Sequence, residues 1–136
     1  LRCGQPANDK ERMQDPRIDD SWAPLTYTFA GIWELQPQWL EENRRAVQIV
    51  DVREPAEFNG SLGHVEGARL IPLGTLLERS KELDLATPIV TVCRSGARSA
   101  QATVLLQKAG FAKVANLAGG MLRWRAARFP VEGGND

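Results

Sequence analysis

Histidine and cysteine are scarce in this chain, which has one histidine and two cysteines among 136 residues. Cys3 and Cys93 lie far apart and show no metal-ligand spacing, so we expect no metal site. Net charge is also lacking, because 17 lysines and arginines balance 17 aspartates and glutamates. The balance gives no reason to expect nucleic acid or a membrane surface as a partner.

Long apolar runs are missing as well. No run approaches the roughly 18 residues of a membrane span, and no charged-then-apolar signal sequence opens the chain. The length suits one domain with one adequate core. Residues 1–28 are polar and lack a sustained period, so we interpret them as a leader or linker and residues 29–136 as the domain.

Beyond the leader, strand patterns alternate with helix patterns. Such alternation predicts an α/β fold with a parallel sheet covered by helices on both faces. Strands are expected at 26–35, 47–52, 69–72, 88–92 and 113–117, and helices at 38–45, 55–58, 76–83, 97–109 and 120–128.

The stretch Cys93-Arg94-Ser95-Gly96-Ala97-Arg98 lies between a predicted strand and a predicted helix. The cysteine therefore sits at the carboxyl end of a strand, where α/β sheets bind their ligands. The amino terminus of the following helix and the charges of Arg94 and Arg98 favour an anion there. They predict a thiol pKa below the usual value of about 8.5. Gly96 allows a tight turn with inward N–H groups, a nest for an anion or a persulfide sulfur.

A lone cysteine at a strand end is often only a small buried hydrophobe. Packing does not explain two arginines and a glycine within the next five positions, since a core has no use for them. The six-residue unit therefore favours a functional interpretation.

This loop resembles the active-site loop of single-domain rhodaneses, which are thiosulfate and persulfide sulfurtransferases. The resemblance covers about residues 32 to 134 and implies a rhodanese-like three-layer fold with a central parallel sheet of about five strands. Three further stretches resemble the same family in the same order: Asp51-Val52-Arg53-Glu54 with Glu57-Phe58, Gly63-His64-Val65-Glu66-Gly67-Ala68, and Asn116-Leu117-Ala118-Gly119-Gly120-Met121 followed by Trp124.

The first four residues, Leu1-Arg2-Cys3-Gly4, are similar to the closing residues of metallo-β-lactamase-fold persulfide dioxygenases. Fusions of such dioxygenases carry a rhodanese domain at the carboxyl side. We therefore expect this chain to be the rhodanese part of a fusion, whose dioxygenase would consume glutathione persulfide made here from thiosulfate and glutathione. We expect no catalytic role for Cys3.

The resemblance implies a covalent mechanism with Cys93 as the nucleophile. Its thiolate attacks the outer sulfur of thiosulfate or glutathione persulfide, and the resulting persulfide passes its sulfur to a thiol such as glutathione, to sulfite or to cyanide. Neither step requires a base, and we expect no metal or organic cofactor. Because the thiol must stay reduced, a cytoplasmic location is favoured.

Within the loop, we expect Arg94 to bind the anionic donor and Arg98 either to help it or to order the loop. Ser95, Gly96 and Ala97 complete the expected substrate-binding set.

Four supporting residues remain open between two roles. Asp51 and Arg53 could reach the pocket, or they could pair and brace the loops. His64 could be a base, or backbone hydrogen bonds could hold it, and the resemblance also suggests a structural part. Trp124 could contribute to the site, although packing suits its place in the last helix better.

Two rival functions stay open. Cysteine phosphatases also use a thiolate and an arginine in a strand-loop-helix cradle, but their loop has five residues between cysteine and arginine, whereas this one has four. A rhodanese-like domain can also be an inactive scaffold or a persulfide carrier that delivers sulfur to a partner. The cysteine and its cationic neighbours argue against the inactive scaffold but not against the carrier.

Overall fold

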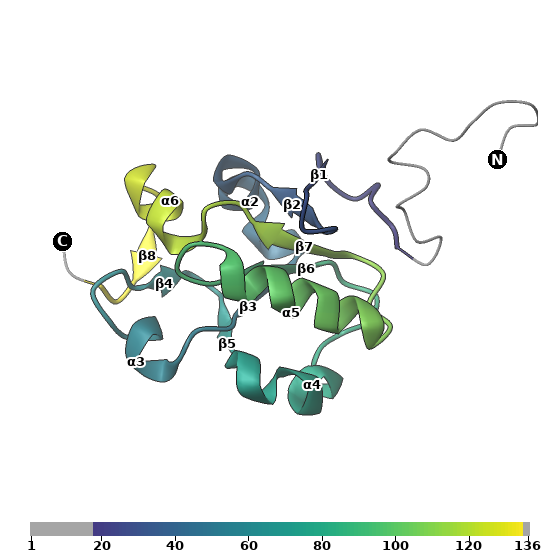
Figure 1. Cartoon of the computed structure of the whole chain (residues 1–136). Helices are drawn as coiled ribbons and strands as arrows, with labels where there is room; N and C mark the ends of the chain where they lie inside the picture. The colour runs from purple at the N-terminus through teal and green to yellow at the C-terminus, as the bar shows by residue number, and fades with distance from the viewer. Residues whose placement is uncertain (1–17, 135–136) are drawn as a thin grey trace, which may run out of the picture.

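The computed structural model describes residues 18–134 and centres on a six-stranded, mostly parallel sheet (Figure 1). The strand order is β1-β2-β7-β6-β3-β5. Only β1 runs antiparallel to its neighbour. The strands are β1 (Thr26–Tyr27), β2 (Trp33–Leu35), β3 (Gln48–Asp51), β5 (Arg69–Leu70), β6 (Ile89–Val92) and β7 (Val114–Leu117). The predicted α/β architecture with a parallel sheet is thus confirmed.

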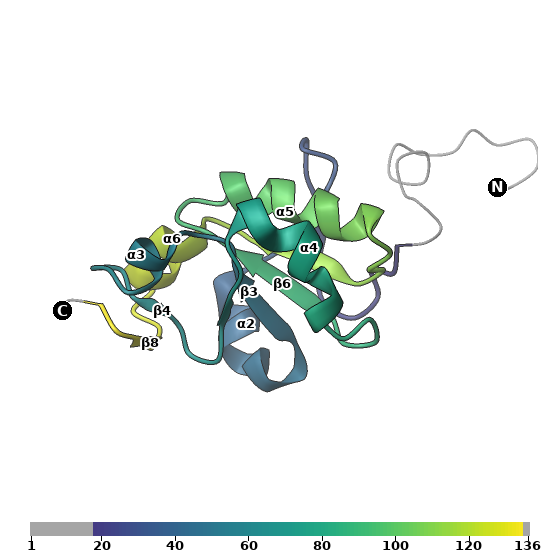
Figure 2. The same ribbon diagram turned by 90° about the horizontal axis from the view of Figure 1, so that it is seen from below.

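Helices cover both faces of this sheet (Figure 2). Because successive strand residues point to opposite faces, Ile49 packs in one core cluster and Val50 in the other. Leu40 and Trp124 of α2 and α6 join the Ile49 cluster, whereas Leu76 and Leu106 of α4 and α5 join the Val50 cluster. The helices are α2 (Pro37–Asn43), α3 (Pro55–Phe58), α4 (Leu76–Arg79), α5 (Ala97–Lys108) and α6 (Gly120–Ala126), with 3₁₀ turns at Arg44–Ala46, Leu73–Thr75 and Ser80–Glu82.

The single edge strand expected over residues 26–35 is wrong in detail. The chain folds back there into the antiparallel pair β1 and β2. Gly31 has a φ of +79° in the turn, and the Thr28 N–H donates to the Ile32 carbonyl at 2.9 Å. The reversal needs a left-handed residue, which glycine adopts readily.

A second small sheet lies beside α3 and was not expected from the sequence. It pairs β4 (His64–Val65) with β8 (Val131–Glu132), and His64 lies opposite Glu132. Two-residue strands carry too little periodicity to be read locally. This pairing holds the carboxyl-terminal segment against the loop that follows α3 (Figure 1).

The described part of the predicted leader, residues 18–28, packs on the domain. Ile18, Trp22 and Leu25 lie against the core cluster that contains Trp33 and Leu40. Asp19 donates its backbone N–H to the carbonyl of Ala112 at 2.8 Å. The stretch Leu1–Gly4, including Cys3, lies outside the described residues, so the boundary at residue 28 and the fusion context stay predictions.

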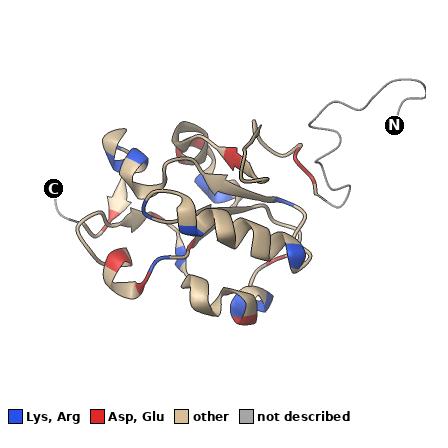
Figure 3. Cartoon of the chain, in the orientation of Figure 1, with Lys and Arg blue, Asp and Glu red and all other residues tan. Residues whose placement is uncertain are grey.

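The charged residues of single elements are mostly of one sign (Figure 3). α5 and α6 carry only lysine or arginine among their charged residues, whereas α2 and α3 carry only glutamate. None of the helices in the described part of the chain is long and apolar enough to cross a membrane.

Candidate active site

The predicted strand-loop-helix unit forms around Cys93. The cysteine directly follows β6 and is buried, with 1% of its surface exposed. Gly96, at φ +114°, turns the chain into α5, which begins at Ala97. A left-handed residue at the start of the helix directs the loop amides inward, because the backbone reverses there.

Hydrogen-bond donors surround the Cys93 sulfur. The Gly96 N–H donates to Sγ at 3.1 Å, and the Ser99 hydroxyl lies 3.3 Å from it. Burial of the thiol raises its pKa, but hydrogen bonds from the Ser99 hydroxyl and from the amides of Ser99, Gly96 and Ser95 outweigh burial and lower the pKa of Cys93 overall. The direction agrees with the sequence prediction, but the cause is mainly these donors rather than the two arginines.

Arg98 is held by an acidic residue of α3. Its Nη1 and Nη2 atoms donate to Glu57 Oε1 and Oε2 at 2.6 and 2.7 Å. The Arg98 hydrogen bond lowers the pKa of Glu57 to about 2, and the carboxylate in turn raises the pKa of Arg98. This fork ties α5 to α3 and favours the loop-ordering role for Arg98.

Arg94, in contrast, is exposed, and its guanidinium has no ion-pair partner among residues 18–134. It lines a hollow of about 190 Å³ together with Arg53, Glu57, Gly60 and Leu62. The guanidinium next to the cysteine is therefore available to an anionic ligand.

The carbonyls of the loop point to α6. Met121 and Leu122 donate their N–H groups to the carbonyls of Cys93 and Arg94 at 2.9 and 3.0 Å. Gly120 makes this approach possible, because a Cβ there would lie 2.5 Å from the Cys93 oxygen. With its carbonyls held outward by α6, the loop keeps its N–H groups for the sulfur.

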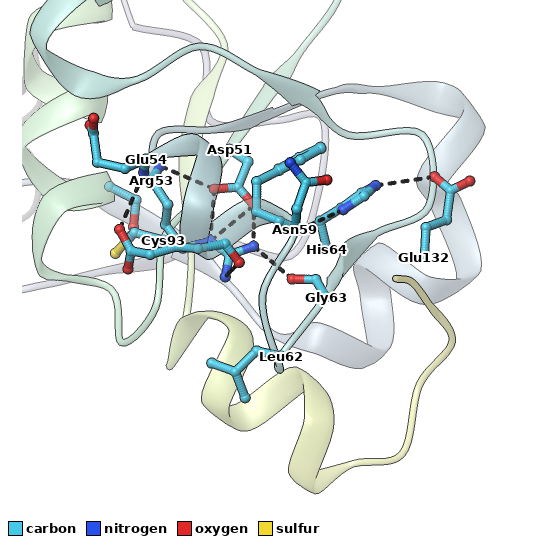
Figure 4. A network of polar contacts seen from close by, with 12 residues as sticks. Asp51, Arg53, Glu54, Asn59, Leu62, Gly63, His64, Cys93 and Glu132 are labelled. Carbon is cyan, nitrogen blue, oxygen red and sulfur yellow. Dashed lines mark hydrogen bonds and ion pairs between the residues drawn. The ribbon is translucent and has the colours of Figure 1, made fainter. Parts of the chain in front are cut away.

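Asp51 and Arg53 form a buried pair, and Arg53 also lines the hollow beside Arg94. Arg53 donates from Nη2 to Asp51 Oδ2 at 2.8 Å, and both residues are at most 1% exposed. Arg53 also donates to the carbonyls of Glu57 and Gly63 at 3.2 and 2.7 Å. The contacts favour the bracing role for this pair (Figure 4).

His64 points toward the carboxyl-terminal segment (Figure 4). Its Nδ1 lies 2.9 Å from the Phe58 carbonyl, its Nε2 lies 3.5 Å from Glu132 Oε1, and its ring stacks on Phe58. Trp124 is fully buried and donates its indole N–H to the Pro130 carbonyl at 2.9 Å. These contacts favour structural roles for both residues.

Two further residues, which the sequence did not assign to the site, lie at the sulfur: Ser99 contacts Cys93 Sγ, and Asn116 contacts Ser99. The Ser99 hydroxyl also lies 2.5 Å from Asn116 Oδ1. Both had a signal in the sequence: Ser99 is a polar residue in the first turn after the loop, and Asn116 interrupts an otherwise apolar strand.

A second hollow, of about 360 Å³, also borders the loop, at Ser95 and Gly96. Thr28, Phe29 and Ile32 line it together with Glu34 and Ser95. Among residues 18–134, no three His, Cys, Asp or Glu side chains gather closely enough to hold a metal ion.

The fold is an α/β domain with a mostly parallel sheet, and its cysteine sulfur lies at the carboxyl end of a strand, where such sheets bind ligands. The family model described as "Rhodanese-like domain" matches residues 36–127, and the chain belongs to that family. The family resemblance noted in the sequence is thereby confirmed.

Relatives of known name agree with this assignment. The chain is 35% identical over 108 residues to the thiosulfate sulfurtransferase GlpE of Pseudomonas paraeruginosa, which covers 79% of this chain and 94% of that protein. It is 42% identical over 80 residues to the uncharacterized protein YqhL of Bacillus subtilis, covering 59% of this chain and 62% of that one. The named thiosulfate sulfurtransferase and the family together support a sulfurtransferase role.

A solved structure shows the same fold. The crystal structure of a rhodanese-related protein from Thermoplasma volcanium is 30% identical, with a TM-score of 0.66, and the match covers 71% of this chain and 94% of that chain.

Proposed function

We propose that this domain moves a sulfane sulfur from thiosulfate or a small persulfide to a small thiol such as glutathione, through a persulfide on Cys93. The observation that carries the proposal is the Cys93 sulfur itself. Amide and hydroxyl donors lower its pKa, and it is followed directly in the chain by Arg94, whose guanidinium has no ion-pair partner among residues 18–134.

In the first step, the Cys93 thiolate attacks the outer sulfur of thiosulfate. A new S–S bond forms, the S–S bond of thiosulfate breaks, and sulfite leaves with the electron pair. The Cys93 persulfide keeps one negative charge on its outer sulfur. No proton has to move, so the domain needs no base at the sulfur.

Charge repulsion is the main barrier to this step, because a thiolate meets a dianion. Two unit charges 4 Å apart interact by about 4 kcal/mol at an effective dielectric of 20. Arg94 offsets this repulsion and can hold two sulfonate oxygens with its planar fork. Arg98 contributes less, because Glu57 already neutralises it.

In the second step, an acceptor thiolate attacks the outer sulfur of the persulfide. The bond to Cys93 Sγ breaks, and Sγ retains the electron pair as a thiolate. The donors that lower the pKa of Cys93 also make its sulfur a better leaving group. Because the cycle starts from a reduced thiol, we place it in a reducing compartment such as the cytoplasm.

Intact mass tests the proposal directly. The chain is incubated with thiosulfate and separated from it, and its intact mass is measured by mass spectrometry before and after treatment with glutathione. A gain of one sulfur, about 32 Da, that glutathione removes is the expected result. Cys93→Ser should gain nothing, whereas Cys3→Ser, which retains the proposed nucleophile, should gain the sulfur like the parent.

Other outcomes favour the rivals. A gain that glutathione leaves in place favours a persulfide carrier with a protein acceptor. No gain from thiosulfate or from a persulfide donor rules out the sulfurtransferase cycle. Hydrolysis of p-nitrophenyl phosphate that is lost in Cys93→Ser would then identify a phosphatase.

A further inference from the structure

The Ser99 hydroxyl has one proton and three acceptors around it. Its Oγ lies 3.3 Å from Cys93 Sγ, 3.2 Å from the Gly96 carbonyl oxygen and 2.5 Å from Asn116 Oδ1. A single O–H donates to one acceptor at a time. Ser99 and Asn116 are buried, with 0% and 3% of their surfaces exposed. Bulk water therefore does not donate to the acceptors that the hydroxyl leaves without a hydrogen bond.

The orientation of the Asn116 amide is set by two other oxygens. Its Nδ2 donates to the Gly96 carbonyl at 3.3 Å and to Glu34 Oε2 at 3.5 Å. If the amide were turned over, its oxygen would face both of these oxygens and repel them. Oδ1 therefore has to face the Ser99 hydroxyl.

We infer that Asn116 is a positioning residue that competes with the Cys93 sulfur for the single proton of the Ser99 hydroxyl. The inference deepens the proposed function, on which its place in the reaction rests. When Cys93 is a thiolate, the hydroxyl turns to the sulfur. When Cys93 carries the outer sulfur, Sγ is uncharged and the hydroxyl turns to Asn116.

This exchange matters most in the second step of the reaction. As the acceptor thiolate takes the outer sulfur, the electron pair returns to Sγ, and the Ser99 hydroxyl has to leave Asn116 to meet it. The amide oxygen thus keeps the hydroxyl hydrogen-bonded while Cys93 carries the outer sulfur, since a buried polar group without a partner is costly.

Alkylation of Cys93 by iodoacetamide, measured against pH, tests the competition without requiring any sulfur transfer. All variants carry Cys3→Ser, so that only Cys93 reacts. Ser99→Ala removes the donor and should slow alkylation at a pH below the pKa of Cys93 by about three- to tenfold. Ser99→Thr restores the hydroxyl and should recover most of the rate.

Asn116→Ala removes the competitor, so alkylation at the same pH should become faster. The decisive comparison is the double variant: in a Ser99→Ala background, Asn116→Ala should change nothing, because no proton remains to compete for. An equal effect in both backgrounds, or no effect in either, overturns the inference. Denaturation with urea confirms that each variant is folded.

Asn116→Asp should change the alkylation rate in the opposite direction to Asn116→Ala. A carboxylate is a stronger acceptor than an amide oxygen, so it should hold the hydroxyl and slow alkylation. Its direct repulsion of the thiolate persists in the Ser99→Ala background, and the difference between the backgrounds isolates the hydroxyl. Arg94, Arg98, Asp51 and Glu34, the charged groups around this corner, are the same in every variant.

A merely structural role for Asn116 predicts the same direction for the Ala and Asp variants, which would overturn the competition. Failure of the sulfurtransferase cycle is a separate result, because it appears as no gain of mass from thiosulfate while these alkylation rates still differ.

Discussion

At the scale of single residues, Cys93 shows how a buried sulfur becomes a good anion. Burial alone raises the pKa of a thiol, because the charged form loses its water. Here the Ser99 hydroxyl and the amides of Ser95, Gly96 and Ser99 replace that water and reverse the direction. The two arginines then divide the remaining work, since Arg98 is paired with Glu57 and Arg94 is unpaired among the described residues.

Arg94→Ala should raise the KM for thiosulfate by about tenfold, because a charged hydrogen bond contributes about 1.5–3 kcal/mol and exposure reduces that figure. The KM for an uncharged sulfur donor should change much less. Steady-state kinetics with both donors make the comparison. Arg45→Ala, at an exposed arginine of the turn after α2, is the matched control and should leave both values unchanged. Equal rises for both donors would contradict the donor-binding role of Arg94.

At the scale of elements, α6 and α3 hold the loop from two sides. The first amides of α6 receive the loop carbonyls, and Glu57 of α3 receives Arg98 of α5. We therefore expect both contacts to help keep the loop amides directed at the sulfur.

Gly120→Ala should separate α6 from the loop. The added Cβ would lie 2.5 Å from the Cys93 oxygen and 2.7 Å from the Arg94 oxygen, at a φ of +56°. Left-handed strain costs about 1–2 kcal/mol, and the clash adds about 1–3 kcal/mol. Urea denaturation measures the loss, and sulfur loading per folded molecule should fall with it.

Gly67→Ala is the matched control for this variant. Gly67 has a φ of +87°, but nothing lies within 4 Å of an added Cβ, so only the strain remains. Equal losses of stability in the two variants would show that the contact between α6 and the loop contributes little.

The ion pair between α3 and α5 should appear in the pH dependence of stability. The pKa of Glu57 is about 2 in the folded chain against an ordinary 4.5. Since the folded value is the lower one, the stabilisation is complete above about pH 4.5 and is lost as pH falls toward 2. Both side chains are about one third exposed, so solvent screening leaves about 1 kcal/mol.

Unfolding free energies at pH 7 and pH 3 measure this contribution. Glu57→Gln should lose about 1 kcal/mol at pH 7 and much less at pH 3. Glu42→Gln, at an exposed carboxyl of α2, should follow the parent at both values. A loss in Glu57→Gln that does not depend on pH would attribute it to the helix cap formed by Glu54 and Glu57 instead.

At the scale of the whole molecule, Arg53 connects three parts of the fold, namely the end of β3, α3 and the residue before β4. Its guanidinium binds Asp51 at the end of β3, the Glu57 carbonyl in α3 and the Gly63 carbonyl before β4 (Figure 4). One buried cation thus joins the main sheet to the small sheet beside α3.

Asp51→Ala should destabilise the chain by about 3–5 kcal/mol, because it leaves Arg53 as an unpaired buried charge. Urea denaturation measures the loss of unfolding free energy.

The double variant Asp51→Ala with Arg53→Met removes both charges and should recover a large part of that free energy. A loss below about 1 kcal/mol in the single variant would contradict the brace, and a fall in sulfur loading beyond the loss of folded protein would assign Asp51 a direct role.

The sequence by itself determined the alternation of the main strands and helices, the loop from Cys93 to Arg98 and the direction of the Cys93 pKa, but not the small sheet of β4 and β8. The elements and the loop follow from the periodicity of neighbouring residues. The pKa direction follows from the helix amino terminus beside the cysteine, because nearby amide and hydroxyl donors rather than the two arginines lower it. The split of residues 26–35 into two strands was not predicted. The polar-apolar alternation continues on both sides of the hairpin turn at Gly31, so the sequence pattern is that of one strand.

Only the tertiary structure decided which groups act on the sulfur and which brace the fold. Glu57 forms an ion pair with Arg98, which is 41 positions away in the sequence, and Asn116 contacts the Ser99 hydroxyl, which is 17 positions away. Asp51 and Arg53 pair with each other, and His64 pairs with Glu132 of β8 rather than with the Cys93 loop. Such contacts depend on how segments far apart in the sequence pack together, and a local sequence pattern contains no information about them.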